Sequence, residues 1–236
     1  MRKTMTWAMA CVVATLACGV AWGAPVGQEV AQRVAEEGVE TVFPGEGWVP
    51  ADAVAVRDGE GGVAAWGFVF ALEGSAYAEA GAVREAVANG ECGNDGESEL
   101  YASTATIVTG ANDTDSLIFR HFRGLADWYQ EGTLDGWRGE AVRLGAGDIR
   151  YGAGAPAGAR GPGKTAALKK AAAARKAAVA AERDALPEYL QKAAEEADAE
   201  AAAAAKARWG AAASQVRQTQ RKAAVRAAEE FNRLMV

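Results

Sequence analysis

The sequence predicts an α+β domain, in which helices pack on a small antiparallel sheet, followed by a Gly/Ala/Pro linker and long Ala-rich helices. Two observations support this fold class. Between residues 54 and 151, short runs rich in Val, Ile, Thr and aromatic residues are separated by Gly-rich turns. From residue 164 onward, 28 of 73 residues are Ala, and Lys, Arg, Glu and Gln, which also favour helices, fill most of the rest.

The charge is distributed unevenly and supports a division into modules. Residues 25–163 carry a net charge of −13, whereas residues 164–236 carry +5. An acidic segment joined to a basic one indicates two modules. We expect a signal peptide at 1–24, an α+β domain at 25–151, a flexible linker at 152–163 and an Ala-rich helical region at 164–236.

The N-terminus resembles a bacterial secretory signal. Arg2 and Lys3 precede a short apolar run, and Ala21 and Gly23 supply small residues before a cleavage site near Gly23 or Ala24. We therefore expect an exported protein, periplasmic or extracellular. An uncleaved membrane anchor is the alternative, and a lipoprotein-like box ending at Cys18 is a minor one.

Cleavage would leave Cys92 as the single cysteine, so we expect no intramolecular disulfide. With one cysteine and one histidine, His121, a zinc site is close to excluded. The spacing of the acidic loop at 91–99 does not fit a Ca²⁺-binding loop. We expect no cofactor, and no membrane span after signal cleavage.

The elements of the first module can be read in order. A helix is expected from Val26 to about Gly38 because valines recur at helical spacing. The stretch "AVAVRDGEGGVAAWGFVFAL" predicts a β-hairpin. Its expected inward residues are Val54, Val56, Val63, Trp66, Phe68 and Phe70.

Weaker patterns cover the rest of this module. We expect a helix or a long excursion within 75–90, a polar loop at 91–98 and a strand within 99–113. A short strand at Leu117–Phe119 should lead into a helical turn through Trp128. The segment 140–152 should form one last edge strand.

The Ala-rich region should form three helical segments, or one long helix kinked at Pro187, with Gly210 as a second natural break. A narrow apolar seam indicates a coiled coil or a helical hairpin. The residues expected to mediate self-association or binding of an unknown protein partner are Leu168, Val179, Leu186, Val216, Phe231 and Leu234.

Two motifs could indicate enzymatic chemistry. The string "GARGPGKT" at 158–165 matches the phosphate-binding P-loop pattern, but "YGAGAPA" precedes it where a buried strand is required. We therefore expect no nucleotide binding. Cys92 and His121 could form a hydrolase dyad, although the carboxylates around Cys92 disfavour a thiolate. Lys and Arg interspersed with Glu are typical of a solvated helix face, so we expect no nucleic-acid binding.

The hairpin and the stretch "ASTATIVTGANDTDSLIFRHFRGLADW" resemble prodomain or inhibitor modules of streptopain-like secreted bacterial cysteine peptidases. The resemblance covers roughly residues 25–130 and lacks a peptidase domain. In this resemblance, Val26–Gly38 corresponds to the leading helix of the family and Trp66–Leu72 to its aromatic strand. Thr106–Ala111 corresponds to the next strand, and Asp115–Phe119 to the last segment. The resemblance implies a non-catalytic module that binds a peptidase or a peptide.

The leading hypothesis is a non-enzymatic exported protein that carries an α+β recognition module on a helical stalk. The alternative is a structural or envelope-associated coiled-coil protein that self-associates through its C-terminal helices. A hydrolase that uses Cys92 and His121 is a remote third.

Overall fold

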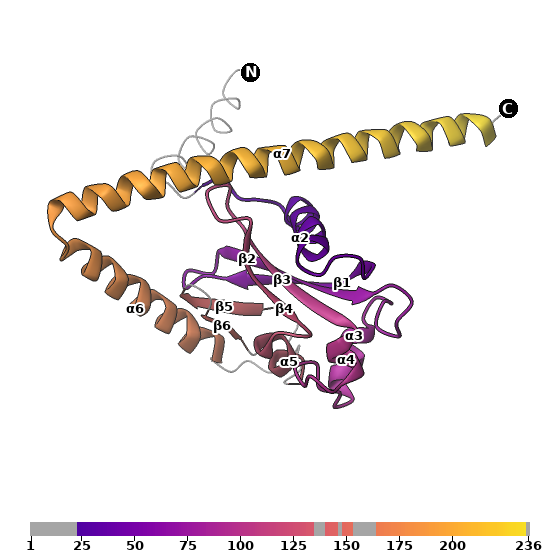
Figure 1. Ribbon diagram of the computed structural model, residues 1–236, viewed down its shortest axis with the longest axis horizontal. Coiled ribbons are helices and arrows are strands. Elements are labelled where there is room, and N and C mark those ends of the chain that lie inside the picture. Colours follow the sequence, from indigo (N-terminus) through magenta and orange to yellow (C-terminus); the bar gives the residue numbers. More distant parts are fainter. Residues whose placement is uncertain (1–22, 135–139, 146–147, 153–163, 235–236) are drawn as a thin grey trace, which may run out of the picture.

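The computed structural model describes residues 23–134, 140–145, 148–152 and 164–234 (Figure 1). Its body is a six-stranded mixed sheet with helices packed against it, and two long helices follow. The predicted α+β class is confirmed. In the described part of the chain, the longest helices are too polar to cross a membrane.

The first helix of the body, α2 (Gln28–Val42), begins and ends later than the sequence pattern indicated. Gly38, the expected end, lies buried inside it. A Cβ at this position would lie 2.5 Å from Cδ1 of Ile118, so the glycine lets this side chain pack on the helix. Gly38 therefore allows close packing of Ile118 on α2 and does not end the helix.

The predicted hairpin is confirmed as β1 (Trp48–Arg57) and β2 (Val63–Leu72), which pair antiparallel. Four of the six expected inward residues are buried, whereas Val63 and Trp66 are half-buried. Ala65, Val69 and Ala71 are buried as well, because both faces of β2 are covered. A strand covered on both faces loses the simple inward and outward alternation.

The middle of the chain adds short helices and two strands. The expected helix within 75–90 is α3 (Ala82–Ala88). The strand expected within 99–113 starts with a helical turn, α4 (Glu99–Ala102), whose Ser98 cap accepts a hydrogen bond from the Tyr101 amide, and continues as β3 (Thr104–Gly110). The strand expected at Leu117–Phe119 and the helical turn expected through Trp128 are both longer than predicted. They are β4 (Ile118–Arg123) and α5 (Asp127–Leu134).

The segment expected to form one edge strand forms two, β5 (Glu140–Gly145) and β6 (Asp148–Tyr151). The strand order is β4-β3-β2-β1-β5-β6. All neighbours pair antiparallel except β1 and β5, which are parallel. The expectation of a purely antiparallel sheet is thus corrected, because β5 follows α5 and returns along the free edge of β1 in the same direction.

The sheet is strongly curled. The Arg143 guanidinium of β5 lies 4.4 Å from the ring centre of Phe119 on β4. Three strands separate β4 from β5, and in a flat sheet that order would hold them roughly 19 Å apart. The two ends of the sheet therefore approach each other around a shared interior.

Two apolar clusters occupy the two faces of the sheet. One places α2 against Phe68, Phe70 and Ile107. The other contains α3 and α5, whose Tyr129 is fully buried. On this second face Gly67 leaves room for the Trp128 indole, since a Cβ at Gly67 would lie 2.6 Å from it.

The C-terminal region forms two helices, α6 (Lys164–Asp184) and α7 (Glu188–Leu234), separated at Pro187 as expected. Gly210 does not interrupt α7, because exposed glycine costs a helix only about 1 kcal/mol. We expected a coiled coil or a helical hairpin, but α6 and α7 diverge from the bend (Figure 1). Instead, α6 packs on β5 and α7 packs on α2.

Candidate interaction surface

The six residues predicted to mediate interactions lie far apart along α6 and α7. Leu168 and Val216 are half-buried, whereas Val179, Leu186 and Phe231 are exposed. Leu234 ends α7, and its side chain lies outside the described part. The two helices do not bring these residues together, because each helix packs on a different part of the body.

The contact that fixes α7 is a short seam centred on Trp209. Ala205, Trp209 and Ala212 are buried, and half-buried Val216 continues the seam with alternating steps of three and four residues. Such steps keep side chains on one face of a helix. Trp209 is 2% exposed, and its Nε1 donates a hydrogen bond to the Asp115 carbonyl oxygen at 2.9 Å.

Helix α6 approaches the β1–β2 turn closely. Ala172 is buried there, and a Cβ at Gly59 would lie 2.8 Å from the Lys169 carbonyl oxygen. Backbone and helix can meet at this distance only because Gly59 has no side chain. The helix region is thus seated on the body at two separate places.

Opposite charges line both contacts. Lys176 Nζ lies 3.6 Å from Glu60 Oε1, and Lys206 Nζ lies 3.8 Å from Asp113 Oδ2. These exposed pairs contribute little free energy each. They show how the basic helices lie against the acidic body, and such complementarity favours this arrangement over others.

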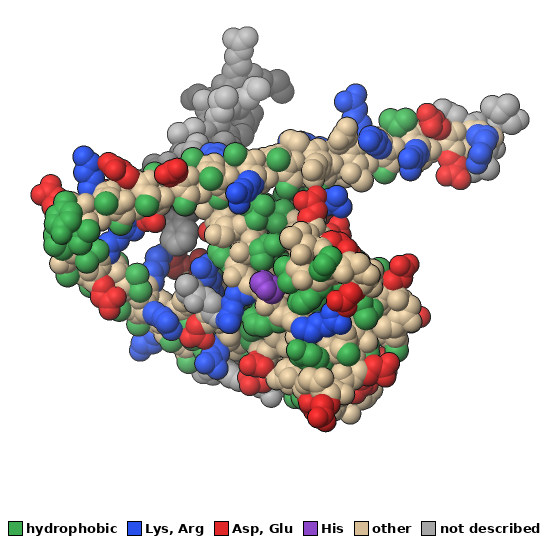
Figure 2. Space-filling view, in the orientation of Figure 1, with side chains coloured by type: hydrophobic (Ala, Val, Ile, Leu, Met, Phe, Trp, Pro, Cys, Tyr) green, Lys and Arg blue, Asp and Glu red, His purple; other side chains and the backbone are tan. Residues whose placement is uncertain are grey.

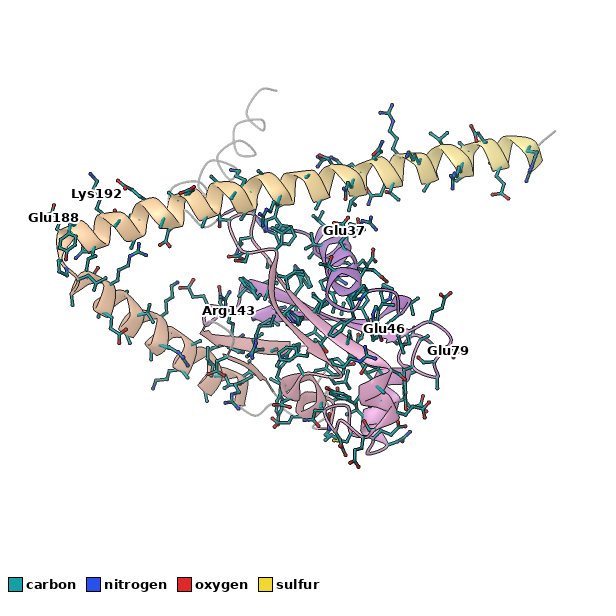
Figure 3. All side chains as sticks on the ribbon, in the orientation of Figure 1. Glu37, Glu46, Glu79, Arg143, Glu188 and Lys192 are labelled. Carbon is teal, nitrogen blue, oxygen red and sulfur yellow. The ribbon has the colours of Figure 1, made fainter. Side chains whose placement is uncertain are left out.

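Both ends of α7 carry exposed apolar side chains outside these contacts. At the bend Tyr189 is 72% exposed and lies beside Glu188, the first residue of α7 (Figure 3). Figure 2 shows apolar side chains gathered there. At the other end α7 extends beyond the body, where Val225 is 50% and Phe231 is 62% exposed.

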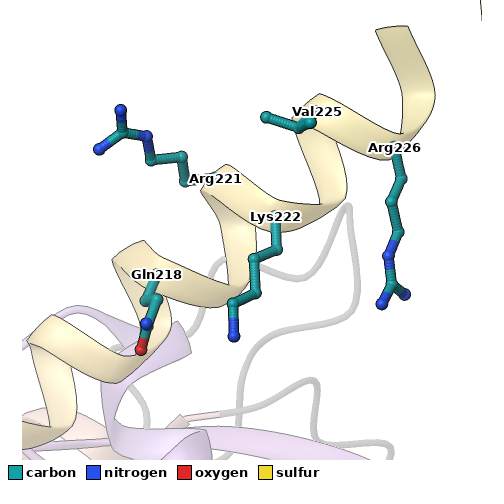
Figure 4. A pocket seen from close by; sticks show the side chains of 5 residues that line it. All are labelled: Gln218, Arg221, Lys222, Val225 and Arg226. Atoms are coloured by element: carbon teal, nitrogen blue, oxygen red, sulfur yellow. The ribbon is translucent and has the colours of Figure 1, made fainter. Parts of the chain in front are cut away.

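Figure 4 shows a shallow hollow on this projecting end, lined by α7 alone. Arg221 extends to one side of the helix, and Lys222 and Arg226 extend to the other. Val225 thus lies among basic side chains. An amphipathic surface of this kind suits a protein partner that supplies apolar and acidic groups.

The residues considered for catalysis have separate surroundings. The Cys92 thiol donates a hydrogen bond to Asn94 Oδ1 at 2.9 Å and accepts one from Gln130 Nε2 at 3.4 Å. His121 meets the Phe43 ring edge-on, with ring centres 6.4 Å apart. Within the described residues, we find no group of three or more His, Cys, Asp or Glu positioned to hold a metal ion.

Most of the P-loop-like string lies outside the described part of the chain. Residues 158–163 lie outside the described part, and Lys164 begins α6.

A partly buried polar cluster joins three elements of the body. Asp52 of β1 accepts hydrogen bonds from Arg84 Nε at 2.5 Å and from the Tyr129 hydroxyl at 2.6 Å. Burial, followed by the charge of Asp52, raises the pKa of Tyr129 above its ordinary value. Tyr129 is fully buried, whereas the Arg84 and Asp52 side chains are 34% and 17% exposed, so the cluster joins β1, α3 and α5 and reaches the surface at Arg84.

Sequence reasoning missed the Trp209 seam and the polar cluster. A single tryptophan in an Ala-rich stretch, with small residues three and four positions away, was a usable signal for the seam. No sequence signal indicates the polar cluster, because Asp52, Arg84 and Tyr129 are far apart in sequence.

Comparison of the chain with protein-family models, with curated proteins and with solved structures finds no match. The resemblance to streptopain-like prodomains therefore rests on the sequence pattern alone.

Proposed function

We propose that this is a non-enzymatic exported protein that binds other proteins through its C-terminal helices, with the α+β body as their platform. The observation that carries the proposal is the placement of α7. Its centre is anchored by buried Trp209, while both of its ends expose large apolar side chains, including Tyr189 and Val225. Exposed apolar surface rimmed by polar and charged side chains is typical of an interaction site.

Helix stability also supports a partner. The projecting end, from Arg221 onward, is exposed at every described side chain. Without buried side chains, the end of a helix frays readily even where it continues a longer helix. A partner that covers Val225 would supply tertiary contacts to this segment.

Export is part of the proposal and rests on the N-terminal sequence pattern. A basic start, a short apolar run and small residues at Ala21 and Gly23 are typical of a cleaved signal.

Site-specific cross-linking tests the binding proposal. A photoreactive side chain introduced at Tyr189 or at Val225 should trap a protein partner in the cells that express this chain. The same group at Glu79, an exposed residue of the body far from α7, is the matched control (Figure 3). Absence of adducts at both helix positions, or equal labelling at Glu79, would overturn the proposal.

A second candidate function is peptide recognition at the edge strand β4. Among the described strands β4 pairs only with β3, and edge strands can pair with extended peptides. Arg120 and His121 of this strand are exposed, and Arg123 lies 4.9 Å from the Trp48 ring centre. The resemblance to peptidase prodomains favours a peptidase or a peptide as the ligand, and the basic side chains on β4 favour acidic groups on it.

This second candidate has its own test. The purified protein should inhibit or bind a streptopain-like cysteine peptidase, and replacing Arg120 and His121 with Glu should weaken the effect. A chain with Val225→Glu should act like the wild type, because α7 is not part of this site. A peptidase that is neither bound nor inhibited at high protein concentration would refute peptide recognition of this type.

A further inference from the structure

We propose that the partner of α7 is a second copy of this chain, and that two α7 helices pair antiparallel about Ala207. This inference rests on the proposed function and specifies its partner. It is argued from the side of α7 that faces away from the body. That side is called the outer face here, and it is marked by Tyr189, Ala207 and Val225.

The three marker residues lie on one line along the helix. Each is 18 residues from the next, and 18 residues make five turns of an α-helix. All three are exposed, and the line lies on the side opposite buried Trp209. Because Ala207 is equidistant from the two ends, antiparallel pairing about it places Tyr189 of each copy opposite Val225 of the other.

The charges of α7 are self-complementary for antiparallel pairing, because an acidic segment and a basic segment lie at equal distances from Ala207. Residues 188–200 contain five acidic residues and one Lys, a net charge of −4. Residues 214–226, which face them when two helices pair about Ala207, contain four basic residues and no acidic one, a net charge of +4. Antiparallel pairing therefore brings two complementary segments together twice.

The helix dipole does not explain this distribution. Its effect falls off within the first and last turns, whereas Glu200 and Arg217 lie well inside α7. Contacts with the body account for only part of this charge distribution, because Glu200, Arg221 and Arg226 are exposed. A second α7 satisfies both charged segments, since a two-fold interface uses the same surface on both copies.

The centre of the outer face allows close approach. Ala203, Ala204, Ala207 and Ala211 are all exposed there, and such small side chains let two helix backbones come near each other. The body packs on the other side of α7. Two copies can therefore meet along their outer faces with their bodies on opposite sides.

Cysteine cross-linking tests the partner and the orientation. In a Cys92→Ser chain, Ala207→Cys places a thiol at the proposed two-fold axis, and oxidation should join two copies. Ala193→Cys, also on the outer face, is the control. In an antiparallel pair the two copies of residue 193 lie about 42 Å apart, beyond the reach of a disulfide. In a parallel pair in register, both positions would cross-link.

The expected result is efficient cross-linking at 207 and none at 193. Cross-linking at both positions, or at neither, would overturn the antiparallel pair. Far-UV circular dichroism checks that each variant keeps the helices. Both substitutions are exposed, so folding should be preserved.

Charge reversal gives an independent readout by sedimentation equilibrium. Replacing Glu195, Glu196 and Glu200 with Lys makes the segments repel and should weaken dimerisation by roughly tenfold or more at low salt. Adding Arg217→Glu, Arg221→Glu and Lys222→Glu exchanges the signs and should restore it. A monomer at all concentrations, or failure of the second set to rescue the first, would contradict the inference.

The outcomes separate this inference from the proposed function. If photocross-linking at Tyr189 and Val225 yields adducts with a different protein and none of twice the chain's mass, the binding function stands and the second copy is refuted. If neither position yields any adduct, both are refuted.

Discussion

Trp209 of α7 donates a hydrogen bond from its indole nitrogen to the backbone carbonyl of Asp115, 94 positions earlier in the chain. Asp115 lies in the β3–β4 loop, and its carboxylate accepts hydrogen bonds from the amides of Ala111 and Asn112. The loop is thus held in shape by its own hydrogen bonds, and Trp209 is bonded to a fixed acceptor. This contact, together with buried Ala205 and Ala212 on either side of Trp209, holds α7 on the body.

Trp209→Ala should release α7 from the body. Truncating a buried aromatic side chain costs about 3–5 kcal/mol, and the neighbouring Ala205 and Ala212 bury too little surface to compensate. We expect a lower free energy of unfolding in urea, together with faster proteolysis within α7. Trp209→Phe keeps most of the apolar contact and loses the hydrogen bond, so its cost should be smaller, about 1 kcal/mol.

Val225→Ala is the matched control for this prediction, since Val225 lies on the same helix and is exposed. At protein concentrations where the chain is monomeric, it should change the free energy of unfolding by less than about 0.5 kcal/mol. If Trp209→Ala has as small an effect as Val225→Ala, the seam does not anchor α7.

Gly59→Val should displace α6. The added side chain would collide with the Lys169 carbonyl and with Ala172 of the helix. Overpacking of this kind costs about 1–3 kcal/mol. Hydrogen exchange of the α6 amides should increase, whereas Gly96→Val, in a loop where a Cβ meets no atom within 4 Å, should leave it unchanged. Equal exchange in both variants would argue against close packing of α6.

Stability should fall at high pH because of two buried tyrosines. Burial, and then the hydrogen bond to Glu91, raises the pKa of Tyr77 to about 12, and burial with Asp52 raises that of Tyr129 as well. An unfolded tyrosine ionises near pH 10. The native state therefore holds these protons more tightly, and this stabilisation is complete below about pH 10 and decreases as the pH rises toward the folded pKa.

Urea unfolding at a series of pH values from about 9 to 11 measures this effect. Tyr77→Phe and Tyr129→Phe should each show a shallower loss of stability with pH than the wild type. Tyr189→Phe, at an exposed tyrosine of α7, should keep the wild-type slope. The explanation fails if all three variants keep the wild-type slope.

The fold class and the hairpin could be predicted because they depend on local patterns. Alternation around Phe68 and Phe70 and the Gly-rich turn at 58–62 encode two paired strands without reference to the rest of the chain. The break at Pro187 is equally local. The parallel pairing of β1 with β5 was not predictable in this way, because it depends on how α5 redirects the chain.

Two glycines have positions that the sequence pattern does not predict. Gly38 and Gly210 fit the pattern of helix ends, yet both lie inside helices. One permits contact with Ile118, and the other is an exposed position where the long Ala-rich helix tolerates it. From the sequence alone, a glycine that ends a helix cannot be distinguished from one that leaves room for a side chain packed against the helix. The seam of α7 was missed for a similar reason, since its alanines become informative only beside Trp209.

Cleavage after Gly23 should create a new ion pair. The backbone nitrogen of Ala24 donates a hydrogen bond to Asp113 Oδ1 at 2.8 Å, and cleavage would turn this amide into a charged amine. A charged donor roughly doubles the strength of such a bond. We expect the exported protein to begin at Ala24, as checked by intact mass and N-terminal sequencing.

Asp113→Asn tests the role of this pair in stability. It should lower the free energy of unfolding by about 1 kcal/mol in a chain that begins at Ala24. In a matched chain that keeps residue 23, where the nitrogen is an uncharged amide, the cost should be smaller. Equal costs in the two chains would show that the terminal charge contributes nothing.

Ending the chain at Gln220 should leave the body intact and abolish self-association. Gln220 donates a hydrogen bond to Glu29 at 2.6 Å and is the last residue of α7 with a described contact to α2. The side chains described beyond it are exposed, so their removal should change the free energy of unfolding by less than about 0.5 kcal/mol. Yet this removal takes away Val225 and three of the four basic residues that would face the acidic segment of a second copy. Sedimentation equilibrium should therefore show a monomer, while urea unfolding matches the wild type at protein concentrations where the wild type is also monomeric. A truncated chain that still dimerises would locate the self-association outside the end of α7, and one that is much less stable would mean that this end packs on the body.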